Sequence, residues 1–351
     1  MATTSTTANT NTNTKTKSLK EQYDKTWNII FGIMLVVAVI GTCFIAGEIK
    51  ELSATLRATN PDYNWSSFSD MKWCIPIFIC IILLKLTLEP ALVHFTKKIM
   101  AKEYRNTNNP EKYQEGIKVS KKLANHIFKG SYYLFITIFG YYILDQTNFF
   151  PRSLLGHGSL PNLFLPGYPQ SFFFYKPKYF DTYYLICFSY TCADFIYLIF
   201  FYERQTDFIN MLLHHVCTMS LILFSYCTNY THAGSIILFL HNETDIFVHL
   251  TRFLIRTDCP EKIKDITGIL LVINFIWVRL FVLGQIIYTI VKYITWDWGY
   301  IVSFSLSFLC FLYIMHLNWT LKLLEKVYQL ACGKQLSDTD GFKKNEVKKE
   351  S

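Results

Sequence analysis

The sequence predicts an all-α integral membrane protein, a multi-span helical bundle of about eight transmembrane helices, and three observations indicate this fold class. Hydrophobic residues make up 51% of the 351 residues, and the mean hydropathy is positive. Only 17% of the residues are charged, whereas soluble domains carry about 25%. The charges gather at 15–25, 97–129, 252–265 and 322–350, and the apolar blocks between them approach the roughly 20 residues that a spanning helix needs.

Eight predominantly apolar runs are the candidate spans. The first begins only after residue 26 and is long enough to remain in the membrane, so it is not a signal peptide. The third is short and must borrow the preceding "LANHIFK", with Lys129 reaching toward the lipid headgroups. In chain order the runs are Trp27–Gly47, Trp73–Leu88, Ser131–Leu144, Tyr183–Tyr202, Phe208–Cys227, Gly234–Leu254, Ile266–Val291 and Tyr300–Leu321.

The basic residues predict which side each loop faces, because Lys and Arg favour the cytosolic side of a membrane. Loop 89–130 carries nine Lys and Arg residues, whereas the long loop 145–182 carries three. Eight spans then place both termini in the cytosol and loop 48–72 in the lumen. In that lumenal loop "NWS" makes Asn64 an acceptor for N-glycosylation, although such tripeptides also occur by chance.

The two ends of the chain carry no predicted folded domain. Residues 1–26 form a Thr- and Asn-rich tail that should be disordered, because it has nothing apolar to bury. Residues 27–72 hold the first span and the lumenal loop, 73–325 form the main transmembrane domain, and 326–351 form a basic cytosolic tail. The tail ends in "KKES", which is either a dilysine retrieval signal for the endoplasmic reticulum or a solvated charge run.

Several function classes lack their motifs in this sequence. The net charge of +8 reflects topology, since no basic block interleaves with exposed aromatics as in a nucleic-acid-binding module. The ten cysteines are scattered singly, with no C-x-x-C pair and no metal-ligand spacing. Walker phosphate loops, Rossmann turns and H-E-x-x-H zinc motifs are absent. We therefore expect no nucleic-acid partner, no metal and no cofactor.

Ionisable residues within the fifth and sixth spans are the strongest functional signal. The fifth span contains the adjacent pair His214 and His215, and an ionisable side chain in hydrocarbon is costly and by default functional. In the sixth span His241, Asp245 and His249 are four residues apart and so share one helix face. The connection "TNYTHA" is short, so the two spans should be antiparallel neighbours that bring these groups together.

The same residues also have plainer explanations. A single buried histidine that is hydrogen-bonded to a backbone carbonyl is common. Arg279 in the seventh span is best explained as a structural partner of a carboxylate or a carbonyl, and Asp194 in the fourth either lines a cavity or is structural. Two adjacent histidines facing His241 and Asp245 on the next span nevertheless favour a shared functional site.

These residues also carry a resemblance to a known family. "GYPQ" at Gly167–Gln170 and "KYFDTYYL" before the fourth span look like a lumenal segment of ceramide synthases in the TLC family, and the resemblance covers most of residues 70–325. It implies an eight-span, TLC-type domain. The residues that resemble the family's Lag1 motif are His214, His215, Ser225, Tyr226, Asn229, Tyr230, Gly234, His241 and Asp245.

The resemblance implies a ceramide synthase, which joins a fatty acyl group from acyl-coenzyme A, a substrate and not a cofactor, to the amine of a sphingoid base. An imidazole could take the proton from the amine, or could attack the thioester and form an acyl-imidazole. Asp245 would hold the ring of His241. The implied catalytic residues are His214, His215, His241 and Asp245, and the implied substrate-binding residues are Asn229, Asn242, His249, Arg252 and Asp194, with the coenzyme A phosphates near Arg252, Arg256 and Lys262.

The chain departs from the family at two positions of the motif region. Asn242 stands where the family has an acidic residue, and His249 where it often has Glu, while Arg252 matches the Lys that follows. Nothing resembles the homeobox-like insert of some animal members. The alternative function is therefore a non-catalytic member of the fold, translocon-associated or lipid-sensing. The sequence leaves open the acyl-chain length, the sphingoid base, and whether the protein forms homo- or hetero-oligomers.

Overall fold

The computed structural model describes residues 5–59, 61, 66–105, 108–164, 176–201, 207–293 and 299–332. Three features expected from the sequence lie outside these residues: Asn64, the "GYPQ" segment and the terminal "KKES".

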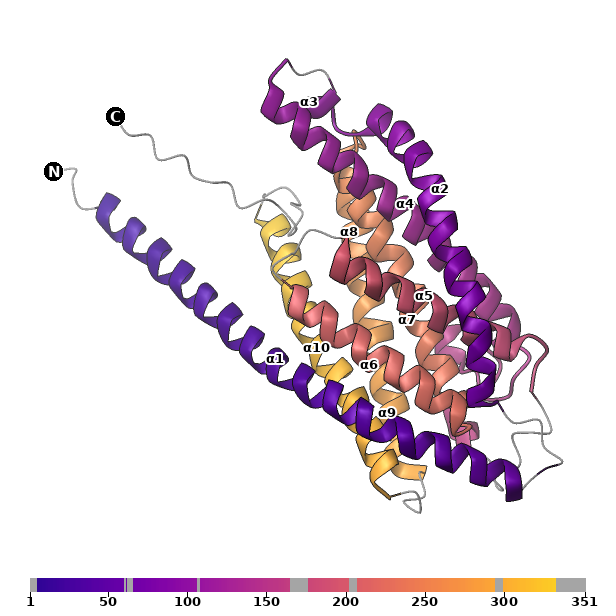
Figure 1. The fold of residues 1–351 in the computed structure, drawn as a ribbon. Coiled ribbons are helices and arrows are strands. Elements are labelled where there is room, and N and C mark those ends of the chain that lie inside the picture. The colour runs from indigo at the N-terminus through magenta and orange to yellow at the C-terminus, as the bar shows by residue number, and fades with distance from the viewer. Residues whose placement is uncertain are drawn as a thin grey trace.

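Long helices dominate the described residues, and Figure 1 shows them arranged as one bundle, with α1 running diagonally across one side. Short helices η1 (Phe68–Trp73), α3 (Lys102–Arg105), η2 (Arg152–Leu154) and η3 (Leu160–Phe164) lie in the connections. The long elements are α1 (Ser5–Thr59), α2 (Cys74–Ile99), α4 (Pro110–Leu144), α5 (Phe180–Phe200), α6 (Phe208–Cys227), α7 (Thr231–Ile255), α8 (Glu261–Phe275), the π-helical segment η5 (Ile276–Val282), α9 (Leu283–Tyr293) and α10 (Gly299–Ala331).

The predicted all-α, multi-span membrane fold is confirmed. Among the described residues, seven helical segments are long and apolar enough to cross a membrane. Each contains, or overlaps almost completely, one of the runs predicted from the sequence. The segments are Lys25–Thr59, Phe68–Ile99, Pro110–Leu144, Phe180–Phe200, Phe208–Cys227, Glu261–Tyr293 and Ser303–Ala331.

The remaining predicted span, Gly234–Leu254, corresponds to α7, a helix of 25 residues that is not among those seven. Its polar residues, His241 to Asp245 among them, make it too hydrophilic to be recognised by composition. The helix nevertheless packs against α4, α6 and α8, and most of its polar residues are buried there. A polar helix of this kind is tolerated at membrane depth when its polar groups face the protein interior.

Two helix boundaries differ from the prediction. Helix α4 extends far upstream of Ser131, to Pro110, where the side chain of Asn109 caps it by accepting a hydrogen bond of 2.9 Å from the Glu111 amide. Helix α1 begins at Ser5, within the tail for which we expected disorder. Once an apolar span has nucleated a helix, extension costs little per residue.

A tight turn joins α6 to α7 and explains part of the sequence motif. Asn229 ends α6 with φ 63°, a left-handed conformation that Asn tolerates better than most residues. At Gly234, an added Cβ would lie 2.3 Å from the hydroxyl of Tyr184 and 2.6 Å from that of Ser225. The same Tyr184 hydroxyl donates to the Thr231 carbonyl at 2.9 Å. Glycine at position 234 therefore lets α7 approach α5 and the end of α6.

The two loops predicted to share the cytosolic side meet in the structure. The amide of Lys102 donates to Asp258 at 2.8 Å, and Arg105 forms an ion pair with the same carboxylate. Met100 and Thr257 also pair through their backbones. The loop after α2 and the loop after α7 thus lie at one end of the bundle, which we call the basic end.

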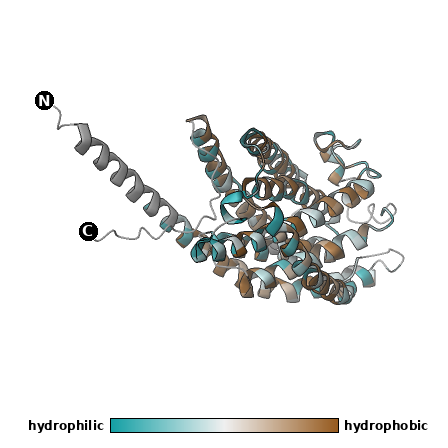
Figure 2. Cartoon of the chain, turned by 90° about the horizontal axis from the view of Figure 1, so that it is seen from above, coloured by the Kyte–Doolittle hydropathy of each residue, from teal (hydrophilic) through white to brown (hydrophobic). Residues whose placement is uncertain are grey.

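The outer surface of the bundle is apolar. Helix α2 exposes Ile75, Ile79, Leu83 and Leu86, which recur at helical spacing on one face. Figure 2 shows hydrophobic residues distributed along the helices of the bundle. Exposed apolar surface of this extent is unusual on a soluble monomer, and it suits contact with lipid.

Candidate active site

Side chains from several helices face one large cavity, which we call the basic cavity, of about 1140 Å³. Its lining includes Asp194, His214, His215, Asp245 and His249. A cavity with many like charges attracts ligands of the opposite sign, here anions. The basic residues that line it are Lys85, Lys118, Lys121, Lys122, Lys129, Arg252, Arg256, Arg279, Lys322 and Lys326.

This lining includes Arg252 and Arg256, two of the three residues expected near the coenzyme A phosphates. The third, Lys262, is exposed on the first turn of α8 and does not line the cavity. The helix turns its side chain outward, and the spacing in the sequence did not reveal that orientation.

A second, narrower cavity of about 130 Å³ continues from the same histidines, and we call it the apolar cavity. The two cavities share Tyr133, Asp194, His214, His215 and Asp245. Beyond this layer the lining is mostly aliphatic and aromatic, with Leu221, Ile222, Phe224, Leu238, Ile290, Leu306, Leu309 and Leu312. The paired histidines therefore lie where a basic compartment meets an apolar one.

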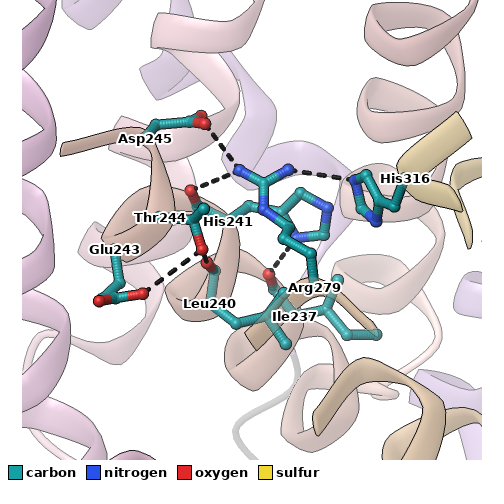
Figure 3. Close-up of polar contacts among 8 residues, drawn as sticks. All are labelled: Ile237, Leu240, His241, Glu243, Thr244, Asp245, Arg279 and His316. Atoms are coloured by element: carbon teal, nitrogen blue, oxygen red, sulfur yellow. Dashed lines mark hydrogen bonds and ion pairs between the residues drawn. The ribbon is translucent and has the colours of Figure 1, made fainter. Parts of the chain in front are cut away.

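Arg279 connects three elements beside this layer, as Figure 3 shows. From η5, its guanidinium donates to Asp245 at 2.7 Å and to the His241 carbonyl at 2.9 Å, both on α7. It also contacts Nε2 of His316 on α10 at 3.1 Å. The prediction that Arg279 partners a carboxylate or a carbonyl is confirmed for both. A π-helical segment changes the direction of the side chains that it carries, and this one carries Arg279.

The expected contact between Asp245 and the ring of His241 is wrong. Nδ1 of His241 lies 2.6 Å from the Ile237 carbonyl, and a carbonyl can only accept, so Nδ1 carries the hydrogen. The Asp245 carboxylate is instead taken by Arg279. The ring of His241 is held by its own helix. The Ile237 carbonyl, one turn earlier, is its hydrogen-bond partner, and the Asp245 carboxylate, one turn later, is not.

Three imidazoles meet next to Arg279 and keep nitrogen atoms without a hydrogen-bond partner among the described residues. The ring centroid of His241 lies 6.1 Å from that of His214 and 5.0 Å from that of His316. The buried atoms Nδ1 of His214, Nε2 of His241 and Nδ1 of His316 have no such partner. Because Nδ1 of His241 is the protonated atom, its Nε2 offers a lone pair. Buried unsatisfied polar atoms are rare and call for an explanation, and a ligand-binding site supplies one.

The sequence analysis missed His316 and Trp319, which lie on α10. The ring of Trp319 lies 5.6 Å from His214 and 5.8 Å from His316. His316 is the only histidine of the last predicted span, and the rule that ionisable residues inside a membrane span are functional by default would have identified it.

His215 faces a different partner, Asp194 on α5. Nε2 of His215 lies 3.6 Å from Oδ2 of Asp194. The Lys129 ammonium on α4 contacts both carboxylate oxygens of Asp194, at 2.6 and 2.7 Å. Lys129 therefore points into the bundle, which corrects the expectation that it reaches toward lipid headgroups. Asp194, which the sequence left as either cavity-lining or structural, is both.

His249 belongs to a separate group at the outer side of the basic cavity. The guanidinium of Arg256 contacts Nε2 of His126 at 2.5 Å, and Nδ1 of His126 lies 3.0 Å from Nδ1 of His249. A guanidinium only donates, so His126 carries its hydrogen on Nδ1 and donates it to His249. The ring of His249 stacks on Tyr133. His126, which the sequence analysis missed, fixes the ring of His249.

Two predicted substrate-binding residues lie away from the histidine nitrogens. Asn229 is buried in the α6–α7 turn and lines neither cavity. Asn242 lines the apolar cavity, but its amide donates across to α5, to the Tyr183 hydroxyl at 3.4 Å and to Sγ of Cys187 at 3.6 Å. Position 242 is adjacent in sequence to His241, and the helical rotation of about 100° per residue sends the two side chains to different neighbours.

Comparison with known proteins gives a consistent result. The TLC domain family matches residues 122–325. Similar curated proteins include Ceramide synthase hyl-1 of Caenorhabditis elegans, 23% identical over 239 residues, which are 62% of this chain and 60% of that protein. Ceramide synthase 1 LOH3 of Arabidopsis thaliana is 32% identical over 83 residues, 24% of this chain and 27% of the relative. Ceramide synthase 3 of Mus musculus is 27% identical over 73 residues, 21% of this chain and 19% of the relative.

The matched regions therefore span about 60% of the length of the first of these relatives and about a quarter or less of the other two.

Proposed function

Because the chain belongs to the TLC-domain family, we propose that it is a ceramide synthase, an N-acyltransferase that moves a fatty acyl group from acyl-coenzyme A to the amine of a sphingoid base. One observation carries this proposal. His214 and His215 lie at the junction of a basic cavity and an apolar cavity. A donor with an anionic head and an apolar chain matches two compartments of this kind.

The two cavities suggest how such a donor binds. The phosphates of coenzyme A pair with cationic side chains of the basic cavity, among them Arg252, Arg256 and Lys322. The acyl chain extends past the histidines into the apolar cavity, toward Leu221 and Leu309. The thioester then lies beside the imidazoles, at the boundary where the polar lining ends.

The chemistry needs a group that accepts a proton. The amine nitrogen forms a bond to the thioester carbonyl carbon, the carbon–sulfur bond breaks, the amine gives up a proton, and the thiolate takes one. An imidazole with a free lone pair can take the amine proton and return a proton to the sulfur. It can also attack the thioester first, forming an acyl-imidazole that the amine then resolves. Nε2 of His241 and Nδ1 of His214 have no hydrogen-bond partner in the part of the chain that the structure describes, and this supports either route.

Arg279 and Asp245 have a supporting role in this proposal. The guanidinium ties α7, η5 and α10 together at the histidine layer. It is positioned to offset negative charge that develops on the thioester oxygen or on the leaving sulfur. No metal and no cofactor takes part in the reaction as proposed, and acyl-coenzyme A acts as a substrate.

The proposal includes a cellular setting. A multi-pass membrane protein with a basic end would expose that end, and both termini, to the cytosol, where acyl-coenzyme A is soluble. We assign the protein to the endoplasmic reticulum membrane, the location that a ceramide synthase function implies. The sphingoid base reaches the histidines from the surrounding lipid. A homo- or hetero-oligomer is compatible with this arrangement.

The direct test is an N-acylation assay. The purified full-length protein in detergent is incubated with a sphingoid base and a panel of acyl-coenzyme A donors of different chain lengths, and mass spectrometry follows N-acylated product. We expect product with at least one donor, and none when the donor is replaced by the free fatty acid. Absence of product with every donor would favour a non-catalytic member of the fold.

A further inference from the structure

We infer that Asp194 on α5 is a positioning residue for His215, and that Lys129 on α4 serves to hold the Asp194 carboxylate in place. This inference rests on the proposed acyltransferase function and assigns the carboxylate that works with the histidine pair to a helix outside the sequence motif.

The contacts of Asp194 support this inference. Its Oδ2 atom lies 3.6 Å from Nε2 of His215 and 2.7 Å from the Lys129 ammonium. The side chains of Asp194 and His215 are each 8% exposed, and that of Lys129 is 12% exposed. The separation of 3.6 Å is longer than a hydrogen bond, but in a buried site it is a strong electrostatic contact. Catalytic hydrogen bonds are often this long before substrate binds.

The other carboxylates of the region have different partners. Asp245 is bonded to Arg279. Glu243 accepts from Asn274 at 2.7 Å and points away from Arg279 in Figure 3. Position 242 holds an amide that faces α5. Among the described residues, the carboxylate in ion-pair contact with the paired histidines is Asp194.

The position of the carboxylate selects one form of the His215 ring. A negative group beside Nε2 favours the tautomer with its hydrogen on Nε2. Nδ1 then carries the lone pair, and within the described ranges Nδ1 of His215 is a buried atom without a hydrogen-bond partner. His215 lines both cavities. The carboxylate therefore prepares an imidazole nitrogen as a base at the junction where the thioester and the amine meet.

Lys129 explains how the carboxylate can be buried. An isolated charge inside a membrane protein is costly, and a paired one costs much less. A buried ion pair nevertheless adds little to the stability of the fold, because apolar residues of similar volume often stabilise it equally well. The location of this pair, in contact with His215 and in the lining of both cavities, is what a role in the reaction requires.

The test must separate positioning from charge balance. Asp194→Asn keeps the shape of the side chain but removes the carboxylate that contacts the Lys129 ammonium, and this change of charge can itself destabilise the fold. The double variant Asp194→Asn with Lys129→Gln removes both charges and restores the balance. Asp194→Glu keeps the carboxylate but lengthens the side chain by one methylene group. Glu243→Gln is the matched control. It neutralises a partly buried carboxylate on α7, and this carboxylate does not face the histidines.

We expect the double variant to unfold at the same temperature as the natural protein. In the N-acylation assay its kcat should be lower by about 10- to 100-fold, with the KM values for both substrates unchanged. Asp194→Glu should keep a higher kcat than Asp194→Asn, and Glu243→Gln should keep the natural kcat.

Natural kcat in the double variant would overturn the inference, because Asp194 would then only balance Lys129. A higher KM for the amine at natural kcat would also overturn it, because Asp194 would then bind substrate. Absence of product from the natural protein would instead refute the proposed function, and this inference with it.

Discussion

Asn242 is a buried residue whose amide connects α7 to α5. It donates to the Tyr183 hydroxyl at 3.4 Å and to Sγ of Cys187 at 3.6 Å, and the histidine nitrogens are not among its hydrogen-bond partners. At this position the sequence departs from the ceramide synthase motif, and the departure suggested a weakened catalytic group. The geometry gives it a different meaning, because the amide bridges two helices and its hydrogen bonds go to α5.

We therefore predict that Asn242→Asp does not raise turnover. The substitution buries a charge next to a tyrosine and a cysteine, and burying a charged group costs more than the about 1–3 kcal/mol of a neutral polar group. The midpoint of thermal unfolding in detergent should fall, and turnover should stay equal or decline. Asn242→Leu serves as the control for loss of the hydrogen bonds without a new charge. A clear rise in turnover at unchanged stability would show that a carboxylate at 242 reaches the histidines.

The sequence identified most residues of the candidate site but not their partners. The pair His214 and His215 stood out because histidines are rare in hydrocarbon, and the structure places both at the junction of the two cavities. The partner of Asp245 could not be derived, because helix spacing relates residues of one helix and Arg279 comes from another. For the same reason the contact of Asp194 with Lys129 was invisible.

At the scale of elements, the packing of α7 against its neighbours depends on Gly234. An added Cβ would lie 2.3 Å from the Tyr184 hydroxyl, whereas at Gly32 in α1 it would meet nothing within 4 Å. Forcing extra atoms into a packed interior typically costs about 1–3 kcal/mol.

We predict that Gly234→Ala lowers the midpoint of thermal unfolding and lowers turnover with it, since α7 carries His241 and Asp245. Gly32→Ala should leave both unchanged, or raise stability slightly through its better helix propensity. Equal stability of the two variants would mean that α5 and α7 can separate without cost.

The length of the apolar runs predicted the helices well. It failed where polar residues of the candidate site interrupt a run. Seven predicted spans correspond to helical segments that are recognisable by length and composition. Helix α7 is not recognisable in this way, because the polar residues that line the cavities reduce its hydropathy. The start of α4 was predicted too late, because its first turns are charged and extend past the apolar run to the Asn109 cap. Charged helical turns carry no signal in a scan for apolar residues.

Across the whole molecule, the order of the spans predicts which surfaces face the cytosol and which face the lumen. Lys112, near the start of α4, is exposed at the basic end, and His157, in the connection after α4, has a side chain that is 81% exposed. One span lies between them. The positive-inside rule places the first in the cytosol and the second in the lumen.

Substituted cysteines test this topology in sealed microsomes. In a protein whose exposed cysteines, Cys43, Cys80, Cys310 and Cys332, are replaced by serine, we introduce Lys112→Cys or His157→Cys. A membrane-impermeant maleimide should label the first directly and the second only after permeabilisation. Labelling of both from one side would mean that α4 does not cross the membrane, and the reverse pattern would place the basic end in the lumen.

If the imidazoles between the two cavities carry out acyl transfer, His214→Ala and His215→Ala should both abolish most of the turnover. His94→Ala, which removes an exposed imidazole from α2, is the matched control. Each of the first two variants should express and unfold like the natural protein, with turnover in the N-acylation assay lower by at least about 100-fold, while His94→Ala keeps natural turnover. Near-natural turnover in both His214→Ala and His215→Ala would contradict the claim.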